Sequence, residues 1–142
     1  MPGIVVGIDG SHSGRQALEW ALRQAAIEHA PLTVLTVHTV ARSAWTGAPI
    51  SVPEDRPGEE KALQAAQEAV DKAITELDVR PEKVTVRAVS GLPARELIEA
   101  SSDADLIVVG SRGHGGFSGL LLGSVSSQVV SHAACPVVVV RH

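Results

Sequence analysis

The chain has 142 residues, and 44% of them are hydrophobic although there are only two Trp, one Phe and no Tyr. One ordinary domain must therefore build its core from Ala, Val, Leu and Ile. A net charge of −4 with 12 Lys and Arg residues argues against nucleic-acid binding. The presence of one Cys favours a reducing, cytoplasmic location. The sequence shows no signal-peptide or membrane-spanning pattern.

Five short apolar runs predict β-strands at residues 3–8, 32–37, 84–89, 105–110 and 136–141. The first, fourth and fifth are almost continuously apolar and rich in β-branched residues, which is typical of strands covered on both faces. Helical periodicity predicts helices at residues 14–30, 59–77, 93–101 and 124–134. This alternation predicts an α/β fold over residues 1–142, with a parallel sheet and helices on both of its faces.

Local signals set the expected boundaries of these elements. Ser13 followed by Gln16 fits a capping box at the start of the first helix. Pro93 fits the first position of the third helix. Residues 41–58 contain three prolines and two glycines and show no period, so we expect a long loop there.

A ligand site is expected at the carboxyl ends of the strands. In open α/β sheets, ligands bind in the crevice where the strand order reverses. If the first strand lies beside the fourth, Asp9 faces the glycine-rich stretch that begins at Gly110. Asp before Gly also commonly forms a turn or caps a helix, so a structural role for Asp9 is the alternative.

The glycine-rich stretch matches neither common phosphate-binding fingerprint. A Walker loop needs a lysine that is absent here, and the dinucleotide pattern G-x-G-x-x-G does not occur in the chain. What remains is Gly110-x2-Gly113-x9-Gly123-Ser124, which ends at a predicted helix start. The free N–H groups of Ser124, Val125 and Ser126, with the hydroxyls of the two serines, would bind an anion without lysine. A slack surface loop is the alternative interpretation.

This spacing and its flanks resemble the universal stress protein family, in the class that binds ATP. The resemblance covers essentially the whole chain: VGIDGS at 6–11, G-x-P-A at 91–94, ADLIVVGSRGHGG at 104–116, LLLGSVS at 120–126 and CPVVVV at 135–140. It implies a five-stranded parallel sheet in the order 3-2-1-4-5, a Rossmann-like fold of the adenine nucleotide alpha hydrolase type.

The resemblance also implies an ATP site with Mg²⁺. Asp9 would meet the ribose or a phosphate-bound Mg²⁺, while Gly7 and the backbone near Thr39 would border the adenosine. Gly110, Gly113 and Gly123 would allow close approach, and Ser124 and Val125 would bind phosphate. The loop closing over the phosphates comprises Gly110, Ser111, Arg112, Gly113, His114, Gly115 and Gly116. Arg112 and His114 either touch phosphate or are simply solvated.

The other reactive side chains favour ordinary roles. The six His residues show no metal-ligand spacing, and Cys135 has no C-x-x-C partner, so we expect a small packing residue. Ser124 lacks the G-x-S-x-G context of a nucleophile. The four valines of the last strand would form an exposed edge, which favours a homodimer through that strand; the alternative is a helix or loop that covers the edge.

The sequence therefore predicts a cytoplasmic, ATP-binding, stress-response or regulatory protein switched by its nucleotide, with no membrane partner and an unidentified protein partner. No dedicated catalytic constellation is present, so we do not expect an enzyme, and slow hydrolysis assisted by Mg²⁺ on Asp9 stays open. One alternative is a nucleotide-free dimeric interaction module of the same fold. Another is an enzyme such as an adenylyl transferase, although the HxGH and SGGxDS signatures are missing.

Overall fold

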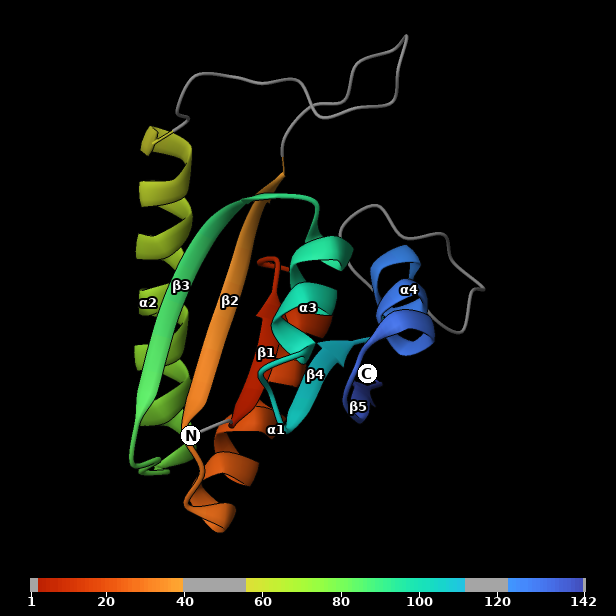
Figure 1. The fold of residues 1–142 in the computed structure, drawn as a ribbon. Helices are drawn as coiled ribbons and strands as arrows, with labels where there is room; N and C mark the ends of the chain where they lie inside the picture. Colours follow the sequence, from red (N-terminus) through yellow and green to blue (C-terminus); the bar gives the residue numbers. More distant parts are fainter. Residues whose placement is uncertain (1–2, 40–55, 112–122, 142) are drawn as a thin grey trace, which may run out of the picture.

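Figure 1 shows the computed structural model of the chain, which describes residues 3–39, 56–111 and 123–141. Strands and helices alternate along the chain. In order they are β1 (Ile4–Ile8), α1 (His12–Glu28), β2 (Leu32–Thr39), α2 (Arg56–Leu77), β3 (Val84–Gly91), α3 (Pro93–Ser101), β4 (Leu106–Gly110), α4 (Ser124–His132) and β5 (Val137–Val140).

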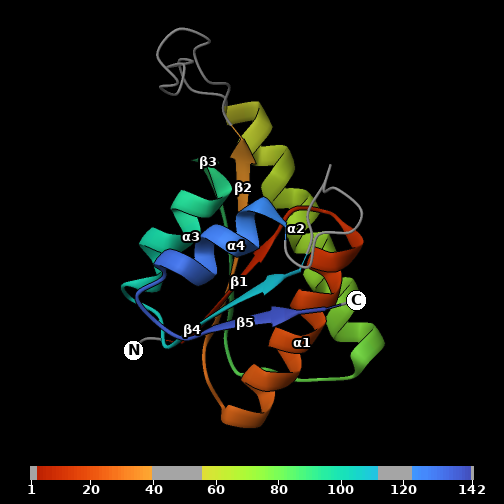
Figure 2. The ribbon, with the colours of Figure 1, turned by 90° about the vertical axis from the view of Figure 1, so that its right-hand side faces the viewer.

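The strands form one parallel sheet in the order β3-β2-β1-β4-β5, which confirms the predicted α/β fold and its strand order. The chain runs outward from β1 to β3, crosses back to β4 and then continues to β5. Because crossover connections between parallel strands are right-handed, this reversal places α1 and α2 on one face and α3 and α4 on the other. Figures 1 and 2 show these two helical layers.

Each face of the sheet has its own apolar core. On the first face, sheet valines, leucines and isoleucines meet small and aliphatic side chains of α1 and α2; the buried members are Ile4, Val6, Ala17, Leu18, Ala21, Leu22, Ala25, Leu32, Val34, Val70, Ala73 and Val108. On the second face, the buried members of the core are Leu35, Leu97, Ile107, Val109 and Val129. Since both faces of β1 and β4 are covered, these strands need the nearly continuous apolar sequence that predicted them.

The first helix starts two residues earlier than its apolar period suggested. Ser11 is the N-cap, and its hydroxyl accepts the N–H of Gly14 at 3.1 Å. The predicted capping box of Ser13 and Gln16 is therefore wrong. Ser13 lies inside the first turn and is only 5% exposed, because this turn packs against the end of β4 rather than facing solvent.

The predicted loop at 41–58 is also too long at its carboxyl end. Residues 56–58 already belong to α2, whose second residue is Pro57. Proline suits the first turn of a helix because its missing N–H would have no helical partner there. Residues 41–55 lie outside the described part of the chain.

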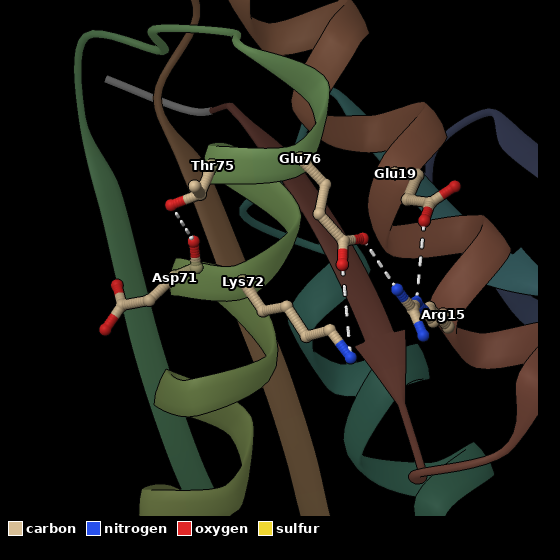
Figure 3. A network of polar contacts seen from close by, with 6 residues as sticks. All are labelled: Arg15, Glu19, Asp71, Lys72, Thr75 and Glu76. Carbon is tan, nitrogen blue, oxygen red and sulfur yellow. Dashed lines mark hydrogen bonds and ion pairs between the residues drawn. The ribbon is translucent and has the colours of Figure 1, made fainter.

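Ion pairs join α1 and α2 on their exposed sides (Figure 3). Arg15 Nη2 of α1 lies 2.8 Å from Glu76 Oε2 of α2, and its Nε lies 3.5 Å from Glu19 Oε1. Lys72 Nζ lies 3.9 Å from the other carboxylate oxygen of Glu76. The side chains of Arg15 and Glu76 are almost half exposed, so each ion pair contributes at most about 1 kcal/mol to stability.

The strand β5 forms one edge of the sheet. All four of its valines are half-buried, with Val138 and Val140 packed on the α1 side and Val137 and Val139 on the α4 side. Val130 of α4 is 49% exposed. Two helices thus cover the faces of β5, and among the strands in the described part of the chain only β4 pairs with it.

Candidate functional site

The carboxyl ends of β1 and β4 lie side by side at the point where the strand order reverses. The register pairs Val6 with Val108, and its continuation places Asp9 level with Ser111. The turn after β1 and the residues after β4 therefore share one edge of the sheet. This is the position where open α/β sheets bind ligands.

The turn after β1 is built around the carboxylate of Asp9. Gly10 takes the left-handed conformation with φ 82°, which glycine adopts without steric cost. The chain then reverses, and Asp9 Oδ1 accepts hydrogen bonds from the N–H of Ser11 at 2.9 Å and from the Ser11 hydroxyl. Asp9 itself is exposed. The predicted turn role of Asp9 is thus present in the structure, and the residue remains exposed at the carboxyl end of β1.

Gly110 lets the first turn of α1 lie against the end of β4. A Cβ at Gly110 would meet the hydroxyl of Ser13, and it would lie 2.6 Å from the carbonyl oxygen of Ser13 and 2.7 Å from its carbonyl carbon. In the structure, the missing side chain of Gly110 makes room for the backbone of α1. This contact keeps the first turn of α1 close to the end of β4.

The start of α4 is joined directly to the end of β4. The N–H of Ser111 donates to the carbonyl of Val140 at 2.9 Å, and the carbonyl of Ser111 accepts the N–H of Gly123 at 2.6 Å. Gly123 is the N-cap of α4, and its carbonyl accepts the N–H of Ser127, the first helical bond. Between these bonds lie the N–H groups of the first helical turn, at residues 124–126, which helix geometry leaves without intrahelical acceptors.

The hydroxyls of the two site serines differ in their surroundings. Ser124 is exposed. Ser126 is 2% exposed, and its hydroxyl lies 3.2 Å from the carbonyl oxygens of both Ser111 and Gly123. In this arrangement the hydroxyl hydrogen of Ser126 is used inside the protein, so the expected donation to a phosphate would require the hydroxyl to turn away from these carbonyl groups. Its backbone N–H remains part of the helix start.

Two predicted residues lie further from this edge. Gly7 belongs to β1, and a Cβ there would lie 2.9 Å from both Leu97 methyl carbons, so its missing side chain makes room for α3. Thr39 ends β2; since Ile8 pairs with Thr36, its backbone lies three residues beyond the end of β1. Arg112, Gly113, His114, Gly115 and Gly116 lie outside the described residues.

Metal-ligating and membrane-spanning features are absent from the described part of the chain. Within residues 3–39, 56–111 and 123–141, no group of three or more His, Cys, Asp or Glu side chains is arranged to hold a metal ion. None of the helices in this described part is long and apolar enough to cross a membrane.

Sequence reasoning missed two residues that shape the site. Ser11 is the first, because its hydroxyl caps α1 and also donates to Asp9. Gly14 is the second, because a Cβ there would lie 2.9 Å from Asp9 Oδ1. The Asp-x-Ser spacing at residues 9–11 was the available signal, because Asp commonly accepts the N–H of the residue two positions later.

Comparison with known proteins identifies the class that this fold and site define. Residues 2–141 match the model of the universal stress protein family, and the chain belongs to that family. A curated universal stress protein of Mycolicibacterium smegmatis is 36% identical over 142 residues, covering 98% of this chain and 48% of the relative. The chain thus spans about half the length of the curated relatives it matches.

Solved structures support the same fold. The universal stress protein UspA from Lactobacillus plantarum matches with a TM-score of 0.73 at 24% identity, covering 99% of this chain and 97% of that one. A universal stress protein solved in complex with cAMP matches with a TM-score of 0.69 at 27% identity, covering 99% and 96%. The chain therefore has the universal stress protein fold, and one structural relative holds an adenine nucleotide.

Proposed function

We propose that this protein binds ATP with Mg²⁺ at the carboxyl ends of β1 and β4, called here the β1–β4 edge. We propose further that it acts as a nucleotide-dependent switch in a stress response. The observation that carries the proposal is the helix start of α4, which the hydrogen bond between Ser111 and Gly123 holds at the reversal point of the sheet. The cAMP complex of a relative supports an adenine nucleotide as the ligand.

The phosphates would lie on the first turn of α4. Ser124, Val125 and Ser126 offer three consecutive backbone N–H groups there, and the positive end of the helix dipole favours an anion. The hydroxyl of Ser124, on an exposed residue, adds a donor. Gly110, Ser111 and the loop glycines after them would complete the cradle, as the sequence predicts. The adenosine would extend toward Gly7 and Thr39.

Asp9 fits a Mg²⁺ that the nucleotide brings with it. Mg²⁺ is commonly held in proteins by one or two carboxylates together with phosphate oxygens and water. Asp9 offers an exposed carboxylate across the edge from α4, and the described residues hold no larger cluster of ligands. When bound, Mg²⁺ would neutralise phosphate charge, while Asp9 and the helix start would orient the phosphate chain.

In this proposal, bound ATP would order the loops at the carboxyl ends of β1 and β4, and a second copy of the chain would pair with β5. ATP contacts with both loops would stabilise one conformation relative to others, which a partner protein can distinguish. The half-buried valines of β5 favour pairing of that edge with a second copy. We propose no dedicated catalysis for this single cytoplasmic domain; slow hydrolysis of ATP remains compatible with the site.

Calorimetric titration with ATP and Mg²⁺ tests the proposal. The wild-type protein should bind one nucleotide per chain, and Asp9→Ala should weaken binding about tenfold, the loss typical of a metal-site residue. Asp103→Ala is the matched control, because it removes the same charge from an exposed residue at the opposite end of the sheet. Failure of the wild-type protein to bind adenine nucleotides would refute the proposal.

A nucleotide-free dimeric module is the second candidate, and the position of β5 as an edge strand with four half-buried valines is the observation in its favour. Sedimentation with and without ATP separates the two candidates. A dimer that forms with no bound nucleotide, and that ATP neither binds nor alters, would favour the interaction module. Turnover above about one per second, the low end of typical enzymes, would instead favour an enzyme.

A further inference from the structure

We infer that Ser11 is a positioning residue that holds the Asp9 carboxylate in the orientation needed for the nucleotide-bound Mg²⁺, and that Gly14 keeps that orientation sterically accessible. The inference rests on the proposed function, since it concerns how the protein prepares Asp9 for a metal. It adds two residues that neither glycine spacing nor helix periodicity assigns to the site.

The Ser11 hydroxyl connects the carboxylate to the start of α1. It accepts the N–H of Gly14 at 3.1 Å and donates its own hydrogen to Asp9 Oδ1. The backbone N–H of Ser11 donates to the same oxygen at 2.9 Å. Because both donors meet at Oδ1, the rotation of the carboxylate is restricted, and Asp9 cannot offer both oxygens equally to a cation.

This arrangement suits Mg²⁺ in particular. Mg²⁺ requires nearly octahedral geometry and is usually held by single carboxylate oxygens together with phosphates and water. Hydrogen bonds to a ligating carboxylate fix its orientation, and the loss of such partners typically lowers metal affinity about 10–100-fold. The Ser11 hydroxyl provides such a bond before any ligand arrives.

Gly14 provides the space for this carboxylate. A Cβ at Gly14 would lie 2.9 Å from Asp9 Oδ1, 3.3 Å from the Asp9 backbone nitrogen and 3.4 Å from the Ser11 oxygen. The Asp9 side chain is the most movable of these neighbours, so an added methyl group would displace the carboxylate. Alanine is also the better helix former, so Gly14→Ala should damage the site without damaging the helix.

Helix capping alone would explain the bond between Ser11 and Gly14, and two substitutions separate that role from the positioning role. Glycine is also a good N-cap, so Ser11→Gly costs only a few tenths of a kcal/mol of helix stability while it removes the hydroxyl. Ser11→Thr keeps a hydroxyl at the same position. Only the positioning role predicts different Mg²⁺ responses for these two variants.

The experiment is calorimetric titration of ATP into wild-type protein, Ser11→Gly, Ser11→Thr and Gly14→Ala, first in EDTA and then in Mg²⁺, with thermal melting of each protein. In EDTA, all four should bind ATP with similar affinity. In Mg²⁺, Ser11→Gly and Gly14→Ala should bind about tenfold more weakly than wild type, whereas Ser11→Thr should remain within about twofold. The melting temperature of Gly14→Ala should be unchanged or higher.

The outcomes distinguish this inference from the proposed function. If wild-type protein binds no ATP in either buffer, both proposals fail. If it binds and shows a Mg²⁺ effect that Ser11→Gly retains in full, Asp9 needs no positioning by Ser11 and the inference is wrong. If Ser11→Gly loses affinity equally in EDTA and in Mg²⁺, the hydroxyl acts on the fold or on phosphate, which also overturns it.

Discussion

Replacing Gly110 with alanine should push the first turn of α1 away from the end of β4, because the added methyl group would occupy the space that Ser13 now fills. The new Cβ would lie 2.6 Å and 2.7 Å from the carbonyl oxygen and carbon of Ser13. Ordinary contacts between such atoms begin at about 3.5 Å. The first turn of α1 must therefore withdraw from β4 by about 1 Å, and both partners are backbone atoms that cannot rotate away.

The expected loss of stability follows from that withdrawal. Overpacking in a well-packed region costs about 1–3 kcal/mol, while alanine recovers up to about 1 kcal/mol by restricting the unfolded chain. Taking the middle of the overpacking range, the net loss is about 1–2 kcal/mol. Since 1 kcal/mol corresponds to about 2–4 °C in a domain approaching 150 residues, the melting temperature of Gly110→Ala should fall by about 2–8 °C.

Differential scanning calorimetry measures this loss, and a second substitution tests its cause. Ser13→Gly in the Gly110→Ala background removes the hydroxyl near the new Cβ and leaves the two backbone contacts. The double variant should therefore remain destabilised. A melting temperature of Gly110→Ala equal to wild type would refute the packing argument, and full recovery in the double variant would show that the hydroxyl was the obstacle.

Two further predictions concern residues away from the β1–β4 edge. Arg15→Ala removes ion pairs to Glu76 and Glu19 that are partly exposed, so urea denaturation should show a loss of at most about 1 kcal/mol; a larger loss that persists in 1 M NaCl would contradict a screened surface network. Burial raises the pKa of the Cys135 thiol, and the nearby Asp105 carboxylate raises it further. The neutral thiol is therefore favoured in the folded state, and thiol labelling at pH 8 should be slower in native protein than in urea; equal rates, or faster native labelling, would contradict this.

Much of the fold was predictable from the sequence because both faces of this sheet are covered. Burial on two sides demands the apolar, β-branched runs that mark β1, β4 and β5, and helices between parallel strands demand the intervening periodicity. Glycine spacing and the resemblance to universal stress proteins pointed to the edge where β1 and β4 meet. The strand and helix patterns depend on residues that are neighbours along the chain, and the glycine spacing follows a pattern repeated in the family. Both can therefore be read from the sequence.

What the sequence could not determine was which atoms meet across that edge. Ser13 is buried against Gly110 because the β1–β4 pairing brings α1 to the end of β4. The Ser126 hydroxyl is occupied because Ser111 and Gly123 are hydrogen-bonded to each other. Helix patterns predict which way a side chain points from its own helix axis. These two roles depend instead on contacts between different elements, from Ser13 to Gly110 and from Ser126 to Ser111. Only the tertiary structure decides which polar groups are used in packing and which face a ligand.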